Sequence, residues 1–154
     1  MGRLSPIVFA QHATKFLRAA KREAHAEPQD VSMPAYFLVA RAIELSLKTY
    51  LLTLGRDRKA LRRISHDLGR ALDEALAAGL RGVTSFSPAE EQYVRWINEY
   101  CWRKELEYPT TGFYSFPPIA MLTDFTERLL RDLEPRTREW GLALARKPRS
   151  RSDS

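Results

Sequence analysis

Three ionisable side chains interrupt an otherwise apolar stretch of the chain: Arg41, Glu44 and Lys48. Their spacing of three and four residues places them on one face of a helix, and we call them the charged stripe. A helix that is apolar on nearly all sides is normally buried, so the stripe would line a cleft or a dimer interface, where Lys48 could bind a phosphate. The alternative is a solvent-exposed Glu-to-Lys pair that stabilises its own helix by roughly 0.2–0.5 kcal/mol. The sequence does not decide between these two interpretations.

A histidine and an aspartate, His66 and Asp67, follow this stretch. A histidine beside a carboxylate can act as a general acid or base. More often such a histidine forms a structural hydrogen bond between helices, and a position at a helix N-terminus favours its neutral ring. We therefore assign no catalytic residue and retain His66 only as a candidate.

Five basic side chains precede His66 and form a dense basic patch. They are Arg56, Arg58, Lys59, Arg62 and Arg63. Arginine can bind a phosphate through two parallel hydrogen bonds, and the formal net charge of +6 favours polyanionic partners. The alternative is a solvated connection, because the patch lacks the interleaved aromatic residues that bind single strands. The full set of candidate ligand-binding residues is Arg41, Glu44, Lys48, Arg62, Arg63, His66 and Asp67.

The cysteine content and the hydropathy pattern restrict the compartment and the cofactors. A single cysteine, Cys101, excludes an internal disulfide and indicates a reducing compartment. It has no second cysteine or nearby histidine with which to bind a metal, and there is no glycine-rich phosphate loop, so we expect neither a metal nor a cofactor. No apolar run is long enough to span a bilayer. We expect a cytoplasmic protein without a membrane partner.

Helical periodicity dominates the chain, and no alternating strand pattern persists. Helices are predicted over residues 5–24, over 34–54, from Ser65 onward, from Ser87 onward and over 119–133. These elements predict an all-α fold, an antiparallel bundle of four to five helices. We expect one helical domain over residues 1–145 and a basic disordered tail over 146–154.

Several residues should set the ends of these helices. Gly55 would end the second helix in a left-handed conformation, and Ser87-Pro88-Ala89-Glu90 would open the fourth with a capping box. Pro135 would break the last helix and leave a short one over 136–145. The aromatic loop over 105–118 should pack across the bundle.

The aromatic side chains on the fourth helix have two interpretations. Tyr93, Trp96 and Tyr100 recur at helical spacing and, with Ile97, would form its inner face. Together with the loop around Phe113 they could instead form a homodimer face.

The order of elements and three short motifs resemble the HEPN family of small helical domains. The motifs are Ala42-Ile43-Glu44-Leu45-Ser46-Leu47-Lys48, His66-Asp67-Leu68 with Leu72 and Gly79-Leu80, and Tyr108-Pro109. The similarity covers roughly residues 16–133. The resemblance implies an antiparallel bundle that usually dimerises and that binds RNA, a nucleotide or a protein partner. Such domains occur in prokaryotic defence and toxin–antitoxin systems and as partners of nucleotidyltransferases.

This chain departs from the nuclease members of that family, which carry an arginine, four to six residues and then a histidine. Before His66, the matching positions hold Lys59, Ala60 and Leu61. Arg18 and His25 have the spacing, but they lie in the first predicted helix. The resemblance then implies a non-catalytic module that binds RNA or nucleotide phosphate, or a partner such as an antitoxin. The alternatives are a metal-independent ribonuclease toxin acting as a dimer through His66, and a protein–protein adaptor.

Overall fold

The computed structural model describes residues 2–26, 31–102 and 115–147, and these residues form helices joined by short connections. The elements are α1 (Pro6–Ala26), α2 (Met33–Thr53), α3 (Arg58–Ile64), α4 (Leu68–Ala77), the short 3-10 helix η1 (Leu80–Gly82), α5 (Pro88–Trp102) and α6 (Ile119–Arg146). No strand occurs in these three ranges, which confirms the all-α prediction for them. Three predicted features lie outside the described residues: the motif Tyr108-Pro109, Phe113 and the tail beyond Lys147.

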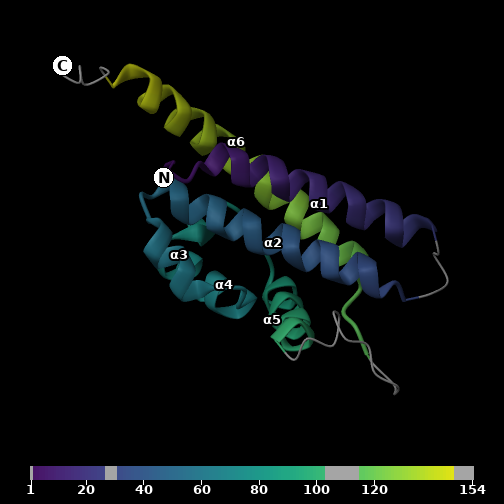
Figure 1. Ribbon diagram of the computed structural model, residues 1–154. Helices are drawn as coiled ribbons and strands as arrows, with labels where there is room; N and C mark the ends of the chain where they lie inside the picture. Colours follow the sequence, from purple (N-terminus) through teal and green to yellow (C-terminus); the bar gives the residue numbers. More distant parts are fainter. Residues whose placement is uncertain (1, 27–30, 103–114, 148–154) are drawn as a thin grey trace.

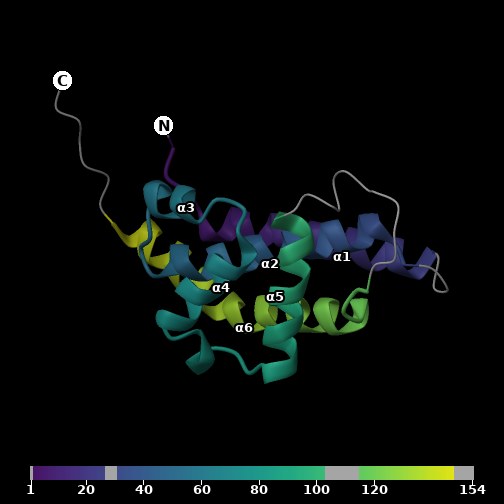
Figure 2. The same ribbon diagram turned by 90° about the horizontal axis from the view of Figure 1, so that it is seen from below.

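Three long helices lie side by side, and the shorter ones pack against them (Figure 1). α1 and α2 run in opposite directions. α6 contacts both of them and runs in the same direction as α2. α4 and α5 contact α2 on its other side, and α5 crosses the direction of the long helices in the view from below (Figure 2). α1, α4, α5 and α6 therefore surround α2, whereas α3 and η1 pack against α4.

The burial of α2 on all sides follows from its sequence. Val39, Ile43 and Leu47 are fully buried and share one core with Leu72 of α4 and Phe125 of α6. The Ser32 hydroxyl accepts a hydrogen bond from the Ala35 amide (3.2 Å) and starts the helix, with proline in its first turn. None of the helices in the described ranges is long and apolar enough to cross a membrane.

Two predicted helix ends are confirmed. Gly55 has a φ of +88° just after α2, a conformation that glycine adopts without steric cost. At the start of α5, the Ser87 amide donates to Glu90 Oε1 (2.9 Å) and the Glu90 amide donates to Ser87 Oγ (3.1 Å). This reciprocal pair is the predicted capping box.

The basic segment before His66 forms a helix, α3, and is not the solvated connection of the alternative interpretation. In α3, Leu61 and Ile64 are buried, and the Asp57 carboxylate accepts a hydrogen bond from the Ala60 amide (2.8 Å) at the N-terminus. Two apolar residues in a seven-residue helix are too weak a periodic signal to stand out among the arginines. The buried pair nevertheless anchors α3 to the core.

The start of α4 also differs from the prediction. Ser65 does not cap α4; it ends α3, with a φ of +54°. Asp67 is the N-cap instead, and its carboxylate accepts a hydrogen bond from the Arg70 amide (3.0 Å). Both residues are good capping types, so the sequence alone placed the boundary two residues too early.

Pro135 does not break α6, contrary to the prediction. The helix continues from Ile119 to Arg146, and proline removes only one of its backbone hydrogen bonds. Leu129, Leu133 and Thr137 are buried at four-residue spacing on both sides of the proline, so the same face stays packed on the bundle. Tertiary packing outweighs the local cost of the proline.

Candidate functional site

The charged stripe is a hydrogen-bonded cluster whose central residue is Glu44. Glu44 Oε1 accepts a hydrogen bond from Lys48 Nζ (2.7 Å), and Glu44 Oε2 accepts one from Arg41 Nη1 (2.8 Å). The side chains of Glu44 and Lys48 are only 7% and 9% exposed. The stripe is therefore not the ordinary solvent-exposed pair of the second interpretation, because its carboxylate and its ammonium group are both removed from water.

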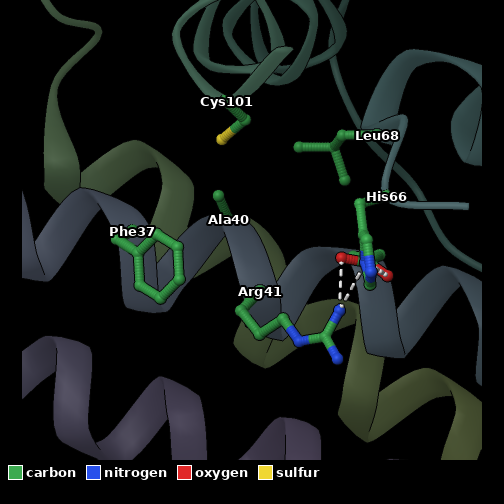
Figure 3. Close-up of a pocket in the computed structure, with 7 residues that line it drawn as sticks. Phe37, Ala40, Arg41, His66, Leu68 and Cys101 are labelled. Carbon is green, nitrogen blue, oxygen red and sulfur yellow. Dashed lines mark hydrogen bonds and ion pairs between the residues drawn. The ribbon is translucent and has the colours of Figure 1, made fainter. Parts of the chain in front are cut away.

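The turn between α3 and α4 brings His66 to this cluster. His66 Nδ1 lies 2.9 Å from Arg41 Nη1 and 3.0 Å from Glu44 Oε1 (Figure 3). One nitrogen cannot serve both partners in the same way: without a proton it accepts from Arg41, and with a proton it donates to Glu44. The imidazole is 75% exposed, so its other face remains open to solvent.

Lys48 also holds the turn in place. Its ammonium group donates a hydrogen bond to the backbone carbonyl of Ser65, the residue with positive φ. Lys48 thus joins the buried carboxylate to the turn that carries His66. Two of its three N–H donors are used within the protein, which makes Lys48 chiefly a residue that positions the site.

The ionisation of Glu44 follows from these contacts. Burial by itself would raise the pKa of the carboxyl group, but the hydrogen bonds and charges of Lys48 and Arg41 outweigh this effect. The pKa of Glu44 therefore lies below its ordinary value, and the carboxylate is charged at neutral pH. It compensates one of the positive charges around it.

A cavity of about 170 Å³, which we call the first cavity, opens beside this cluster (Figure 3). Its walls are mainly apolar, with the cluster on one side. The lining residues are Phe37, Ala40, Arg41, Glu44, His66, Leu68 and Cys101. Phe37 and His66 lie on opposite sides of it, and Cys101 of α5 faces Ala40.

A second cavity of about 290 Å³ also has His66 in its lining. It is lined by Leu4, Phe9, Lys48, Arg58, Leu61, Arg62, Ser65 and His66. The described residues of this lining include three cationic side chains and no carboxylate. We refer to it as the second cavity.

The fold brings five of the seven predicted binding residues together: Arg41, Glu44, Lys48, Arg62 and His66. Arg63, although exposed on the same helix as Arg62, lines neither cavity.

Asp67 has a structural role. It caps α4, and its Oδ1 atom also accepts a hydrogen bond from Asn98 Nδ2 (3.0 Å). The Asn98 Oδ1 atom in turn accepts from the Leu68 amide (2.8 Å), so this pair joins α4 to α5.

The predicted binding set omitted several residues of the two linings, among them Arg58 and Phe37. Arg58 belongs to the basic patch, and its spacing of four from Arg62 places both on one helix face once the segment is known to be helical. Phe37 lies in the apolar stretch before Arg41, which indicates a buried side chain, but it is 37% exposed at the first cavity.

The aromatic side chains of α5 are half-buried rather than central to the core. Among residues 88–101 of this helix, Val94 and Ile97 are fully buried, whereas Tyr93 and Trp96 are half-buried with ring centroids 6.4 Å apart. The ring of Tyr100 stacks on Phe116 at 4.6 Å. The predicted inner face therefore shifts toward Val94.

No group of histidine, cysteine, aspartate and glutamate side chains that could hold a metal ion occurs among residues 2–26, 31–102 and 115–147.

Comparisons of the chain with protein-family models, with curated proteins and with solved structures found no match.

Proposed function

We propose that this protein is a non-catalytic, HEPN-like helical module that binds a phosphate group of RNA or of a nucleotide. The single observation that carries the proposal is the second cavity, where Lys48, Arg58, Arg62 and His66 meet with no carboxylate among the described lining residues. Such a wall attracts an anion and gives it several N–H donors.

The geometry of α3 supports this proposal. Arg58 and Arg62 are one helical turn apart and line the same cavity. The guanidinium group of Arg58 donates to the backbone carbonyl of Gly2 (3.3 Å), which uses one of its five N–H bonds. The remaining donors are suited to the two-pronged hydrogen bonds that arginine forms with phosphate.

The charges around the site also favour an anion. Arg41, Lys48, Arg58 and Arg62 are positive, and Glu44 is the carboxylate in contact with this group. Glu44 already accepts hydrogen bonds from two cations, so its charge is compensated inside the cluster. The excess positive charge lies on the side of the second cavity.

A salt titration of RNA binding tests the proposal. The double substitution Arg58→Ala with Arg62→Ala should weaken the binding of a labelled single-stranded RNA, measured by fluorescence anisotropy. Each arginine that no longer neutralises a phosphate should lower the slope of log affinity against log salt concentration by roughly 0.7, hence by about 1.4 for the double variant.

The matched control is Lys59→Ala with Arg63→Ala, which removes the same charge from the same helix but leaves the lining unchanged. Its slope should remain close to that of the wild type. Equal reductions in the two double variants would show that only net charge matters and would contradict a site at the second cavity.

The proposal includes the partners that the HEPN resemblance implies. These are a second copy of this chain, and a nucleotidyltransferase or an antitoxin in a prokaryotic defence or toxin–antitoxin system. Light scattering of the purified protein would give a dimer mass if the first partner is correct.

One observation favours a second candidate function, a metal-independent ribonuclease acting as a dimer. The carboxylate of Glu44 is 3.0 Å from Nδ1 of the exposed His66 ring, an arrangement that orients a histidine for general acid–base catalysis. If this candidate is correct, the wild type cleaves structured RNA and His66→Ala does not. Absence of cleavage by the wild-type protein, or equal cleavage by both proteins, would exclude His66 as the catalytic group.

A further inference from the structure

We infer that the first cavity binds the nucleobase of the ligand whose phosphate occupies the second cavity, so that the recognised unit is a nucleoside phosphate. This inference rests on the proposed function, because it takes the phosphate position from it. It adds a base subsite at Phe37, Ala40, Leu68 and Cys101.

The two cavities share one wall. His66 lines both of them, with its Nδ1 side against Glu44 and Arg41 and most of its ring exposed. A ligand can therefore extend from one cavity to the other across the exposed imidazole. A sugar placed over His66 would join a base on one side to a phosphate on the other.

The volumes also favour one ligand that spans both cavities. Small-molecule sites typically have volumes of roughly 300–1,000 Å³. The first cavity, about 170 Å³, falls below this range and the second, about 290 Å³, lies at its lower limit, whereas together they lie within it. Each cavity by itself suits a fragment of a nucleotide.

The linings of the two cavities differ in charge. Both contain apolar side chains, but the described lining of the second carries three cations and no carboxylate, whereas in the first Arg41 is paired with Glu44. Phe37 lies across the first cavity from His66 and is 37% exposed, so its ring is accessible for contact with a base (Figure 3). Stacking on an aromatic ring is a common way in which proteins hold an unpaired base.

Calorimetric titration with three probes tests this inference: a nucleoside 5′-monophosphate, ribose 5-phosphate and the nucleoside without phosphate. The monophosphate should bind most tightly. Phe37→Ala should weaken its binding about 5- to 100-fold, as loss of base stacking does, and should leave the binding of ribose 5-phosphate unchanged. Ala40→Leu, which fills the first cavity, should have the same selective effect.

The matched control is Leu54→Ala, which removes another exposed apolar side chain, 42% exposed, that lies outside both cavities. It should not change the binding of any probe, and circular dichroism should show that all variants are folded.

Three outcomes separate this inference from the proposed function. If ribose 5-phosphate binds as tightly as the nucleotide, and Phe37→Ala changes neither, the phosphate site stands and the base subsite is overturned. If no phosphate-bearing probe binds although the labelled RNA does, the base subsite is overturned and the phosphate site stands. If the RNA does not bind either, or if Arg58→Ala with Arg62→Ala changes none of the affinities, the proposed function itself fails and the base subsite fails with it.

Discussion

Replacing Glu44 with alanine should lower the free energy of unfolding by about 3–5 kcal/mol. The substitution leaves the ammonium group of Lys48, whose side chain is 9% exposed, without its carboxylate partner. A buried charge that loses its partner keeps its desolvation cost and loses the ionic attraction that offset it, and the hydrogen bond from Lys48 to the Ser65 carbonyl does not neutralise the charge. Urea denaturation followed by circular dichroism would measure the decrease.

The matched variant Lys48→Met should be less harmful than Glu44→Ala. It removes the buried cation, but Arg41 still donates to Glu44 Oε2 at 2.8 Å and keeps the carboxylate paired. Methionine also preserves most of the aliphatic length of the lysine. A smaller destabilisation by Glu44→Ala than by Lys48→Met would contradict the central position of Glu44.

The effect of Glu44→Ala should also depend on pH. Because the pKa of Glu44 is lower in the folded protein than in the unfolded chain, its ionised form stabilises the fold at pH values above the unfolded pKa of about 4.3. This contribution disappears as the pH falls through the folded pKa. The difference in stability between the wild type and Glu44→Ala should therefore be greatest near neutral pH and shrink on acidification.

The second large effect is expected at Phe125, whose replacement by alanine should cost about 3–5 kcal/mol. Phe125 of α6 is 1% exposed. Its ring packs edge-to-face against the ring of Phe86, which lies just before α5, with the ring centroids 5.6 Å apart. Its removal leaves a void between α6 and the segment that leads into α5. The melting temperature should fall by roughly 6–20 °C, at about 2–4 °C per kcal/mol.

Leu142→Ala on the same helix is the control for Phe125→Ala. Leu142 is 52% exposed, and surface substitutions of this kind usually change stability by less than about 0.5 kcal/mol. Similar destabilisation by the two variants would mean that the central part of α6 is not packed against the bundle as the structure shows.

The long helices were predictable because their apolar periodicity extends over many turns. α2 needed no tertiary information: its apolar sequence, Gly55 after its end and the proline in its first turn all indicate the same element. α3 was not predictable in this way, because only two of its seven residues are buried and two apolar positions give too weak a periodic pattern. The continuation of α6 through Pro135 depends on packing that local rules do not contain.

The candidate site was predictable only in part, for a similar reason. Helical spacing alone places Arg41, Glu44 and Lys48 on one face. Their contact with His66 depends on a turn in which Ser65 has positive φ, and serine at that position does not indicate such a conformation. Asp67 was not predicted as the N-cap of α4, because an N-cap carboxylate and a binding carboxylate have the same sequence signature.

The order in which the chain is synthesised separates the site from the completion of the core. With the exception of Cys101, the residues that line the two cavities lie within the first 68 residues, whereas α6 ends at Arg146. At roughly 5–20 residues per second, a ribosome needs about 4–16 s to make the intervening segment. Through that interval the nascent chain carries its basic cavity residues, while the faces of α1 and α2 that α6 later contacts remain uncovered. The apolar faces that α6 covers are therefore exposed for longest during synthesis, and the chain should be most prone to aggregate before α6 is complete.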